Sequence, residues 1–65
     1  MEKIYCVFDM FYGDFIENFA SFEDAKEFCT NPKNIAHSYG FEIGKWIDDD
    51  SYELLEEVFN PNVCR

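Results

Sequence analysis

Carboxylates are the side chains of this 65-residue sequence whose number and spacing could do chemistry. Fourteen acidic residues stand against five basic ones, which gives a formal net charge of −9. Six of the fourteen fall in the stretch from Asp48 to Glu57, which reads Asp-Asp-Asp-Ser-Tyr-Glu-Leu-Leu-Glu-Glu. Carboxylates at this density can ligate a hard metal ion, form an acid–base pair, or contact a basic surface. The neighbouring residues decide among these uses.

The acidic run is a poor match to a metal site. Asp48, Asp50 and Glu53 supply the oxygen ligands that calcium and magnesium prefer. A calcium-binding loop that started at Asp48, however, would have Tyr52 at a ligand position and Phe59 in place of the bidentate Glu. We therefore expect no dedicated metal site here.

A catalytic site is not indicated either. His37 is the single imidazole, and its spacing from Cys29 matches neither half of a zinc-finger pattern. Nucleophilic catalysis would need a nucleophile, a base and an oxyanion site that converge in a pocket, for which so short a chain leaves little room. We expect the protein not to be an enzyme and to hold no metal or cofactor.

Direct binding of nucleic acid is also not expected. The five cations are scattered along the chain and form no basic stripe: Lys3, Lys26, Lys33, Lys45 and Arg65. The fourteen anions would repel a phosphate backbone. The use that remains is contact with a basic surface of a protein partner, and the alternative is a solvated acidic face that serves only solubility.

The rest of the composition indicates a folded chain. Apolar residues make up 48% and aromatic residues 20%, which is too hydrophobic for an acidic disordered tail. We expect one compact domain over residues 1–65. Its thirteen aromatic residues, eight Phe, four Tyr and one Trp, exceed what so small a core encloses comfortably, so some should lie at the surface, where such rings mark interfaces.

The cysteines indicate a reducing compartment. Cys6, Cys29 and Cys64 are odd in number and widely spaced. We expect no signal peptide, because Asp9 and Asp14 interrupt the apolar N-terminal stretch. No apolar run approaches the ~20 residues that a membrane-spanning helix needs. We expect free thiols in a cytoplasmic protein, with Cys6 and Cys29 in the core and Cys64 accessible.

Alternating apolar residues predict strands over 3–11, 15–20 and 41–47. The first two strands form a hairpin, because the turn between them contains Gly13. Within the first strand, Ile4, Cys6, Phe8 and Met10 share one face.

Two segments have helical periodicity and caps. Ser21 is a good N-cap for a helix over 22–30, and a second helix is expected over 51–59. Residues 35–39 are either a fourth strand or part of a short helix that begins at Pro32 and ends at Gly40. The expected fold is α+β: a small antiparallel sheet of three or four strands with two helices packed on one face, in the order ββαβα or ββαββα.

These elements position the candidate site. Each expected helix carries carboxylates four residues apart, which makes them neighbours on the helix surface. Trp46 lies on the strand that leads into the acidic run, on the face opposite Phe41 and Ile43, so it is left at the sheet surface if the helices cover the other face. The candidate partner-binding residues are the carboxylates and this tryptophan: Asp48, Asp49, Asp50, Glu53, Glu56, Glu57, Glu23, Glu27 and Trp46.

In size, charge and aromatic content the whole chain resembles the small acidic proteins that bacteriophages encode to disable host enzymes, including anti-CRISPR proteins and nucleic-acid mimics. This resemblance implies a stoichiometric inhibitor that acts in a host cytoplasm on a nucleic-acid-acting or defence enzyme. The competing hypothesis is a structural or regulatory interaction module that uses an aromatic sheet surface, with a homodimer as one form. Mimicry should weaken steeply with salt, whereas an aromatic interface should hold.

Overall fold

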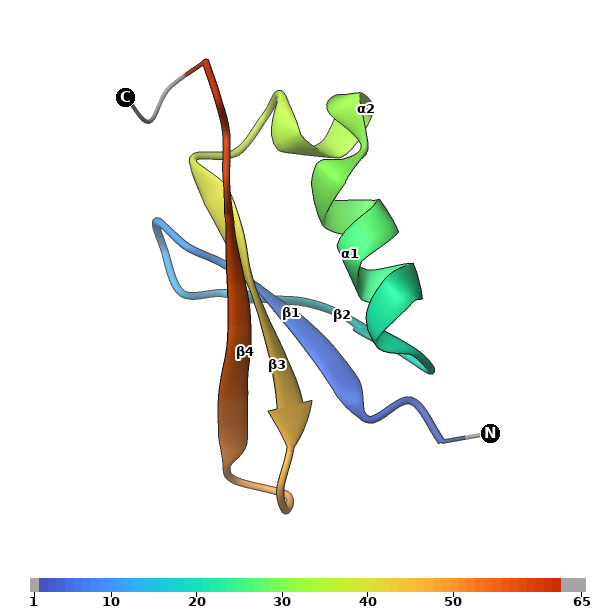
Figure 1. Cartoon of the computed structure of the whole chain (residues 1–65). Coiled ribbons are helices and arrows are strands. Elements are labelled where there is room, and N and C mark those ends of the chain that lie inside the picture. Colours follow the sequence, from blue (N-terminus) through green and yellow to red (C-terminus); the bar gives the residue numbers. More distant parts are fainter. Residues whose placement is uncertain (1, 63–65) are drawn as a thin grey trace.

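The computed structural model describes residues 2–62, which form a four-stranded antiparallel sheet and two helices. The elements in chain order are β1 (Tyr5–Asp9), β2 (Phe15–Phe19), α1 (Phe22–Thr30), α2 (Pro32–Ile35), β3 (Gly40–Trp46) and β4 (Tyr52–Phe59). The strand order in the sheet is β2-β1-β3-β4, so β1 and β3 are central and β2 and β4 are the edges (Figure 1). The α+β class is confirmed, whereas the element order is ββααββ.

The first hairpin forms as expected. Gly13 adopts a φ of 75°, and its amide donates to the Asp9 carbonyl oxygen at 2.7 Å. This left-handed conformation favours glycine, because the Cβ atom of another residue would come too close to the following carbonyl oxygen. The three expected strands are present, with β1 and β2 somewhat shorter than predicted and β3 beginning one residue earlier.

The first helix is confirmed at its predicted bounds. The Ser21 hydroxyl accepts a hydrogen bond from the Asp24 amide at 3.1 Å and so caps α1. After α1, the Asn31 side chain accepts from the Lys33 amide at 2.9 Å and starts α2, with Pro32 in its first turn. The short-helix interpretation of this segment is therefore right at its start, although α2 ends at Ile35. A strand over 35–39 is wrong.

The predicted helix over 51–59 is wrong, because this segment is the edge strand β4. Its Leu and Glu residues favour a helix, but a helix this short is marginal without packing, and Glu53 and Glu57 would repel each other across one turn. As a strand it pairs along the whole of β3 instead. The Ile47 amide donates to the Ser51 carbonyl oxygen at 2.9 Å, which closes the connecting turn.

A β-bulge interrupts the alternation of apolar and polar residues along β4, so the sequence pattern did not indicate a strand. Ile43 pairs with Glu56 and the next residue, Gly44, pairs with Leu54, so Leu55 is an extra residue. An extra residue inverts the face on which later side chains lie. Val58 therefore packs against the core, although it would lie on the other face if the strand continued without interruption from Leu54.

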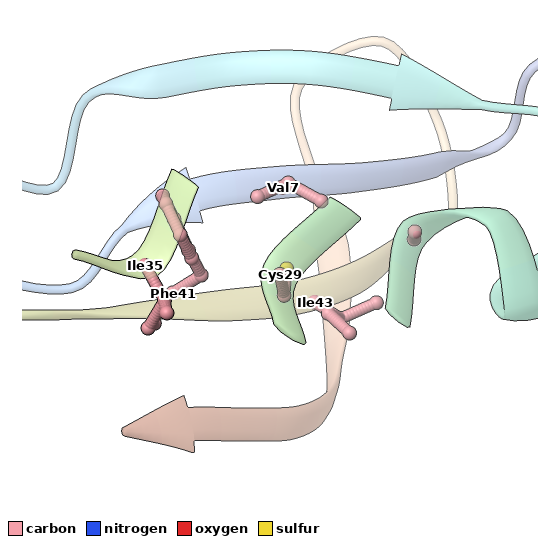
Figure 2. Packing of buried hydrophobic residues seen from close by; sticks show 6 residues of the cluster. Val7, Cys29, Ile35, Phe41 and Ile43 are labelled. Atoms are coloured by element: carbon pink, nitrogen blue, oxygen red, sulfur yellow. The ribbon is translucent and has the colours of Figure 1, made fainter. Parts of the chain in front are cut away.

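The core lies between the sheet and the helices, which are on the same side of the sheet (Figures 1 and 2). Figure 2 shows Val7 of β1 and Phe41 and Ile43 of β3 close to Cys29 of α1 and Ile35 of α2. All of these side chains are buried. Neither helix in residues 2–62 is long and apolar enough to cross a membrane.

The thiols lie on opposite faces of the sheet. Cys29 belongs to the core beneath α1, whereas Cys6 shares the other face of β1 with Phe8. Both side chains are fully buried and neither forms a disulfide, as expected. The expectation for Cys64 lies outside the described residues.

Candidate functional site

The sheet face opposite the helices, here called the open face, carries four aromatic rings in mutual contact. Phe8 of β1 lies at the centre of this aromatic cluster, with its ring centroid 4.6 Å from that of Tyr52, 5.8 Å from that of Phe15 and 6.0 Å from that of Trp46. The rings of Phe8 and Tyr52 are stacked, and the others meet edge to face. Such pairs contribute about 0.5–1.5 kcal/mol each beyond area burial, so the cluster stabilises a platform on this face of the sheet.

Trp46 fixes this platform across three strands. Its indole nitrogen donates to the side-chain oxygen of Asn18 at 2.9 Å, which links β3 to β2 across β1. Cys6 of β1 pairs with both Asn18 and Gly44 and is fully buried, although neither helix lies on its side. The rings therefore cover it. The predicted position of Trp46 on the face opposite Phe41 is confirmed, and the side chain is half-buried.

Tyr52 occupies the space above Gly44. A Cβ atom on Gly44 would lie only 2.5 Å from a Tyr52 ring carbon, so a side chain at this position would displace the ring. Partial burial raises the pKa of the Tyr52 hydroxyl, and the nearby negative charge of Glu42 raises it further. The Tyr52 hydroxyl can donate a hydrogen bond.

Two carboxylates face each other beside the aromatic cluster. Glu42 of β3 and Glu57 of β4 are paired directly across the two strands, and Glu42 is also the partner of Phe8 on β1. Like charges at such positions are destabilising by roughly 0.2–1 kcal/mol. The one ion pair within residues 2–62 joins Lys26 to Glu56, so no cation of this segment neutralises Glu42 or Glu57.

Apolar side chains extend the open face beyond the cluster. Phe15 is 49% exposed, and on β4 Leu54 is 49% and Phe59 is 50% exposed. Their register partners Phe8, Gly44 and Gly40 lie on the open face. This face is therefore a band of aromatic and aliphatic side chains that the Glu42–Glu57 pair crosses.

The aspartates of the predicted site form the turn between β3 and β4. Asp48, Asp49 and Asp50 are exposed at one end of the molecule, directly after Trp46 and Ile47. The Asp48 carboxylate accepts a hydrogen bond from the Asp50 amide at 2.9 Å, which stabilises the turn. Part of this acidity therefore has a local structural use.

The glutamates of β4 do not form one row. Glu53 pairs with Lys45, and Glu56 lies on the helix side, where its carboxylate contacts the Lys26 ammonium group. Glu57, beyond the bulge, lies on the open face. The two carboxylates predicted to be neighbours on a helix, Glu53 and Glu57, thus lie on opposite faces of the sheet.

The helix carboxylates form a separate surface. Glu23 and Glu27 are exposed on α1, on the other side of the molecule from Trp46. Of the predicted site residues, the structure brings Trp46 and Glu57 together on the open face, with Asp48–Asp50 at its end. It does not bring Glu23, Glu27, Glu53 or Glu56 to that face.

The sequence analysis missed the ring partners of Trp46. Phe8 was predicted on the correct face of its strand, but Tyr52 was assigned to a helix. Glu42 and Phe15 were not among the predicted site residues. The signal that could have found Tyr52 is the aromatic content, because more rings are present than the core holds. Gly44 is a second signal. Because it adds no side chain to the Trp46 face of β3, a ring from another strand can cover the backbone there.

Metal binding has no structural support in residues 2–62. No group of three or more His, Cys, Asp or Glu side chains there is arranged to hold a metal ion. His37 lines a shallow depression together with Ser38 and Asp9, and neither buried thiol is among the lining residues of that depression. The open face is thus the candidate site that geometry favours.

Comparison with family models, with curated proteins and with solved structures finds no match. The functional argument therefore depends on the residues and their arrangement.

Proposed function

We propose that this protein is a non-catalytic binding module that docks its open face on a basic surface of a protein partner. The observation that carries the proposal is the aromatic cluster of Phe8, Phe15, Trp46 and Tyr52, which lies opposite the helices and next to the uncompensated carboxylates of Glu42 and Glu57. Trp and Tyr are enriched among the residues that contribute most to binding at protein interfaces.

The apolar part of the face supports a docking role. The side chains of Val7, Phe41 and Ile43 are buried in the core beneath the helices. The rings on the other side remain partly accessible, and Leu54 and Phe59 add to the same band. Several exposed apolar side chains gathered on one face of a small protein are typical of an interaction surface.

The charge favours a basic partner over a second copy. Two copies meeting through this face would bring together the Glu42 and Glu57 carboxylates of each, on chains that each carry −9. A partner with exposed Arg or Lys would instead relieve the repulsion between the two glutamates and could place its cations over the rings.

The phage-type inhibitor is a narrower form of this proposal. In that form the basic surface is the nucleic-acid groove of a host enzyme, and the carboxylates at the Asp48–Asp50 turn stand in for phosphates. The net charge of −9 supports it. The expected helix over 51–59 is a strand, so the turn and Glu57 would have to supply the contacts.

A matched pair of double variants tests the proposal. Glu42→Gln with Glu57→Gln and Glu23→Gln with Glu27→Gln remove the same charge from the open face and from α1. A partner captured from host lysate is identified and purified, and its affinity for each variant is measured at low salt. We expect at least a tenfold loss for the open-face variant, because close interfacial charge pairs couple by about 1.5 kcal/mol or more, and less than a twofold change for the other.

A second arm separates the apolar contribution. Phe15→Ser with Leu54→Ser removes exposed apolar contacts without changing the charge. We expect this variant to lose affinity at about 0.05 M and about 0.5 M salt alike, since apolar contacts are not screened. Equal losses from the two glutamate variants, or unchanged affinity of the serine variant, would contradict docking through the open face.

A further inference from the structure

A second aromatic patch lies at the end of the molecule remote from the Asp48–Asp50 turn. Phe11 and Tyr12 of the β1–β2 turn are 66% and 75% exposed, and Tyr39 lies beside them just before β3. The Phe11 ring centroid is 4.7 Å from that of Tyr12 and 5.9 Å from that of Tyr39. These three rings, here called the end patch, are distinct from the aromatic cluster of the open face.

The end patch borders a shallow depression of about 390 Å³ that Asp9 and His37 also line. One oxygen of the Asp9 carboxylate accepts a hydrogen bond from the Phe11 amide at 3.2 Å. The same oxygen lies 3.2 Å from the Ser38 hydroxyl, whose single hydrogen is divided between Asp9 and the Gly40 carbonyl oxygen at 2.9 Å. Ser38 is itself fixed, since its hydroxyl oxygen also accepts from the Gly40 amide at 3.2 Å. A positioned carboxylate thus lies next to three aromatic rings.

The turn that presents the rings is well defined. The Asp9 amide donates to the Asp14 carbonyl oxygen at 2.8 Å, and the Gly13 amide donates back to the Asp9 carbonyl oxygen at 2.7 Å. Large rings at a turn that is fixed by backbone hydrogen bonds contribute little to the core, because the core lies beneath the helices. The exposed rings of Phe11 and Tyr12 are therefore available to bind a ligand.

We infer that the end patch binds an arginine side chain of a protein partner, with the guanidinium group against the rings and its charge toward Asp9. A guanidinium group is weakly hydrated, stacks on aromatic faces and pairs with carboxylates, which are the two chemistries present here. The overall charge of −9 favours a cationic occupant as well. This site does not depend on the open face, so either can exist without the other.

The test uses the intact chain and a small probe. N-acetyl-arginine methylamide is titrated into the ¹³C- and ¹⁵N-labelled protein, and the ring resonances of Phe11, Tyr12 and Tyr39 are followed. N-acetyl-citrulline methylamide, which has nearly the same shape without the charge, is the matched control. We expect saturable shifts confined to the end patch with arginine, and at least threefold weaker binding of citrulline.

Two variants locate the site. Phe11→Leu removes one ring from an exposed position, and Asp9→Asn removes the charge but keeps an oxygen that can accept both hydrogen bonds. We expect each to weaken arginine binding at least about threefold, Phe11→Leu through the loss of one exposed cation–π contact and Asp9→Asn through the loss of one exposed charge pair. Phe15→Leu, on the open face, should have no effect. Equal binding of citrulline, or unchanged binding by both variants with an unperturbed spectrum elsewhere, overturns the inference.

Discussion

Asn60 shows how much of this fold depends on a single polar side chain. It is fully buried, and its amide group donates to the carbonyl oxygens of Ile35 at 2.7 Å and Ser38 at 2.8 Å, while its oxygen accepts from the Asn62 amide at 2.9 Å. The end of β4 is thereby joined to α2 and to the segment that leads into β3. Each buried partner that loses its hydrogen bond carries a desolvation cost.

We therefore expect Asn60→Ala to lower the free energy of unfolding by about 2–4 kcal/mol, since two carbonyl oxygens and one amide lose their partner together. Urea denaturation followed by tryptophan fluorescence measures the change. Asn62→Ala, at an exposed neighbouring position, is the control and should change stability by less than about 0.5 kcal/mol. Equal effects of the two substitutions would show that the Asn60 contacts do not hold β4 in place.

Cys29 gives a pH dependence whose sign follows from burial. Burial raises the pKa of the Cys29 thiol to about 12, well above the value of about 8.5 in an unfolded chain. Above pH 8.5 the unfolded state therefore loses this proton first and is favoured. We expect the free energy of unfolding to fall with rising pH above about 8.5, by up to about 1.4 kcal/mol per pH unit from this group.

Denaturation curves between pH 7 and pH 10 test this, with Cys29→Ala as the comparison. The variant should be less stable at pH 7 but should lose less stability on going to pH 10. Parallel losses in both proteins would mean that Cys29 ionises in the folded state as readily as in the unfolded one. Alkylation is a second test: we expect native Cys29 to react with iodoacetamide only after unfolding.

The edge strand β4 is the element on which the sequence analysis failed, and the reason is physical. Leu55, Val58 and Phe59 recur at helical spacing, and the bulge at Leu55 breaks the alternation that would have marked a strand. Pairing with β3, which decides the outcome, is a long-range property that local propensity does not contain. Helix α1, in contrast, carries its cap and its stop within its own segment and was predicted at its observed bounds.

The same difference explains what was found of the site. The position of Trp46 followed from alternation within one strand, and the structure confirms it. The cluster around Trp46 joins β1, β2, β3 and β4, and its composition depends on which strands are neighbours. The acidic residues were assigned to the wrong faces. In a helix Glu53 and Glu57, four residues apart, would lie on the same face, whereas in the bulged strand they lie on opposite faces of the sheet.

Gly44 links this element to the site. A Cβ atom there would meet the Tyr52 ring at 2.5 Å and the Glu53 carbonyl oxygen at 3.1 Å. We expect Gly44→Ala to displace Tyr52 from Phe8 and to lower the free energy of unfolding by about 1–3 kcal/mol, the usual cost of overpacking. Thermal unfolding and the Tyr52 ring resonances report the change. Lys45→Ala, at the exposed next position, should leave both unchanged, and an undisturbed Tyr52 in the Gly44 variant would contradict the packing described.

At the scale of the whole molecule, the net charge of −9 opposes the compact state. Raising the salt concentration from about 0.01 M to about 1 M shortens the screening length from about 30 Å to about 3 Å. We expect the melting temperature to rise by at least 4 °C over this range, about 1 kcal/mol for a domain of this size. A variant with Glu23, Glu27, Glu42 and Glu57 all changed to Gln should show a smaller rise. An equal rise in the melting temperature of this variant would show that salt acts on apolar surface and not by screening the charges.

The strand order has a consequence for the path of folding. The molecule consists of two local hairpins, β1–β2 and β3–β4, joined where β1 pairs with β3, and that pairing brings together residues as distant as Val7 and Ile43. A single hairpin is marginal in water, so neither half has a stable existence before the two meet. Closing the long loop between them is the slow event, and α1 and α2 lie within that loop. We expect substitutions at the β1–β3 seam to slow refolding in stopped-flow measurements, whereas changes in the Asp48–Asp50 turn chiefly alter unfolding.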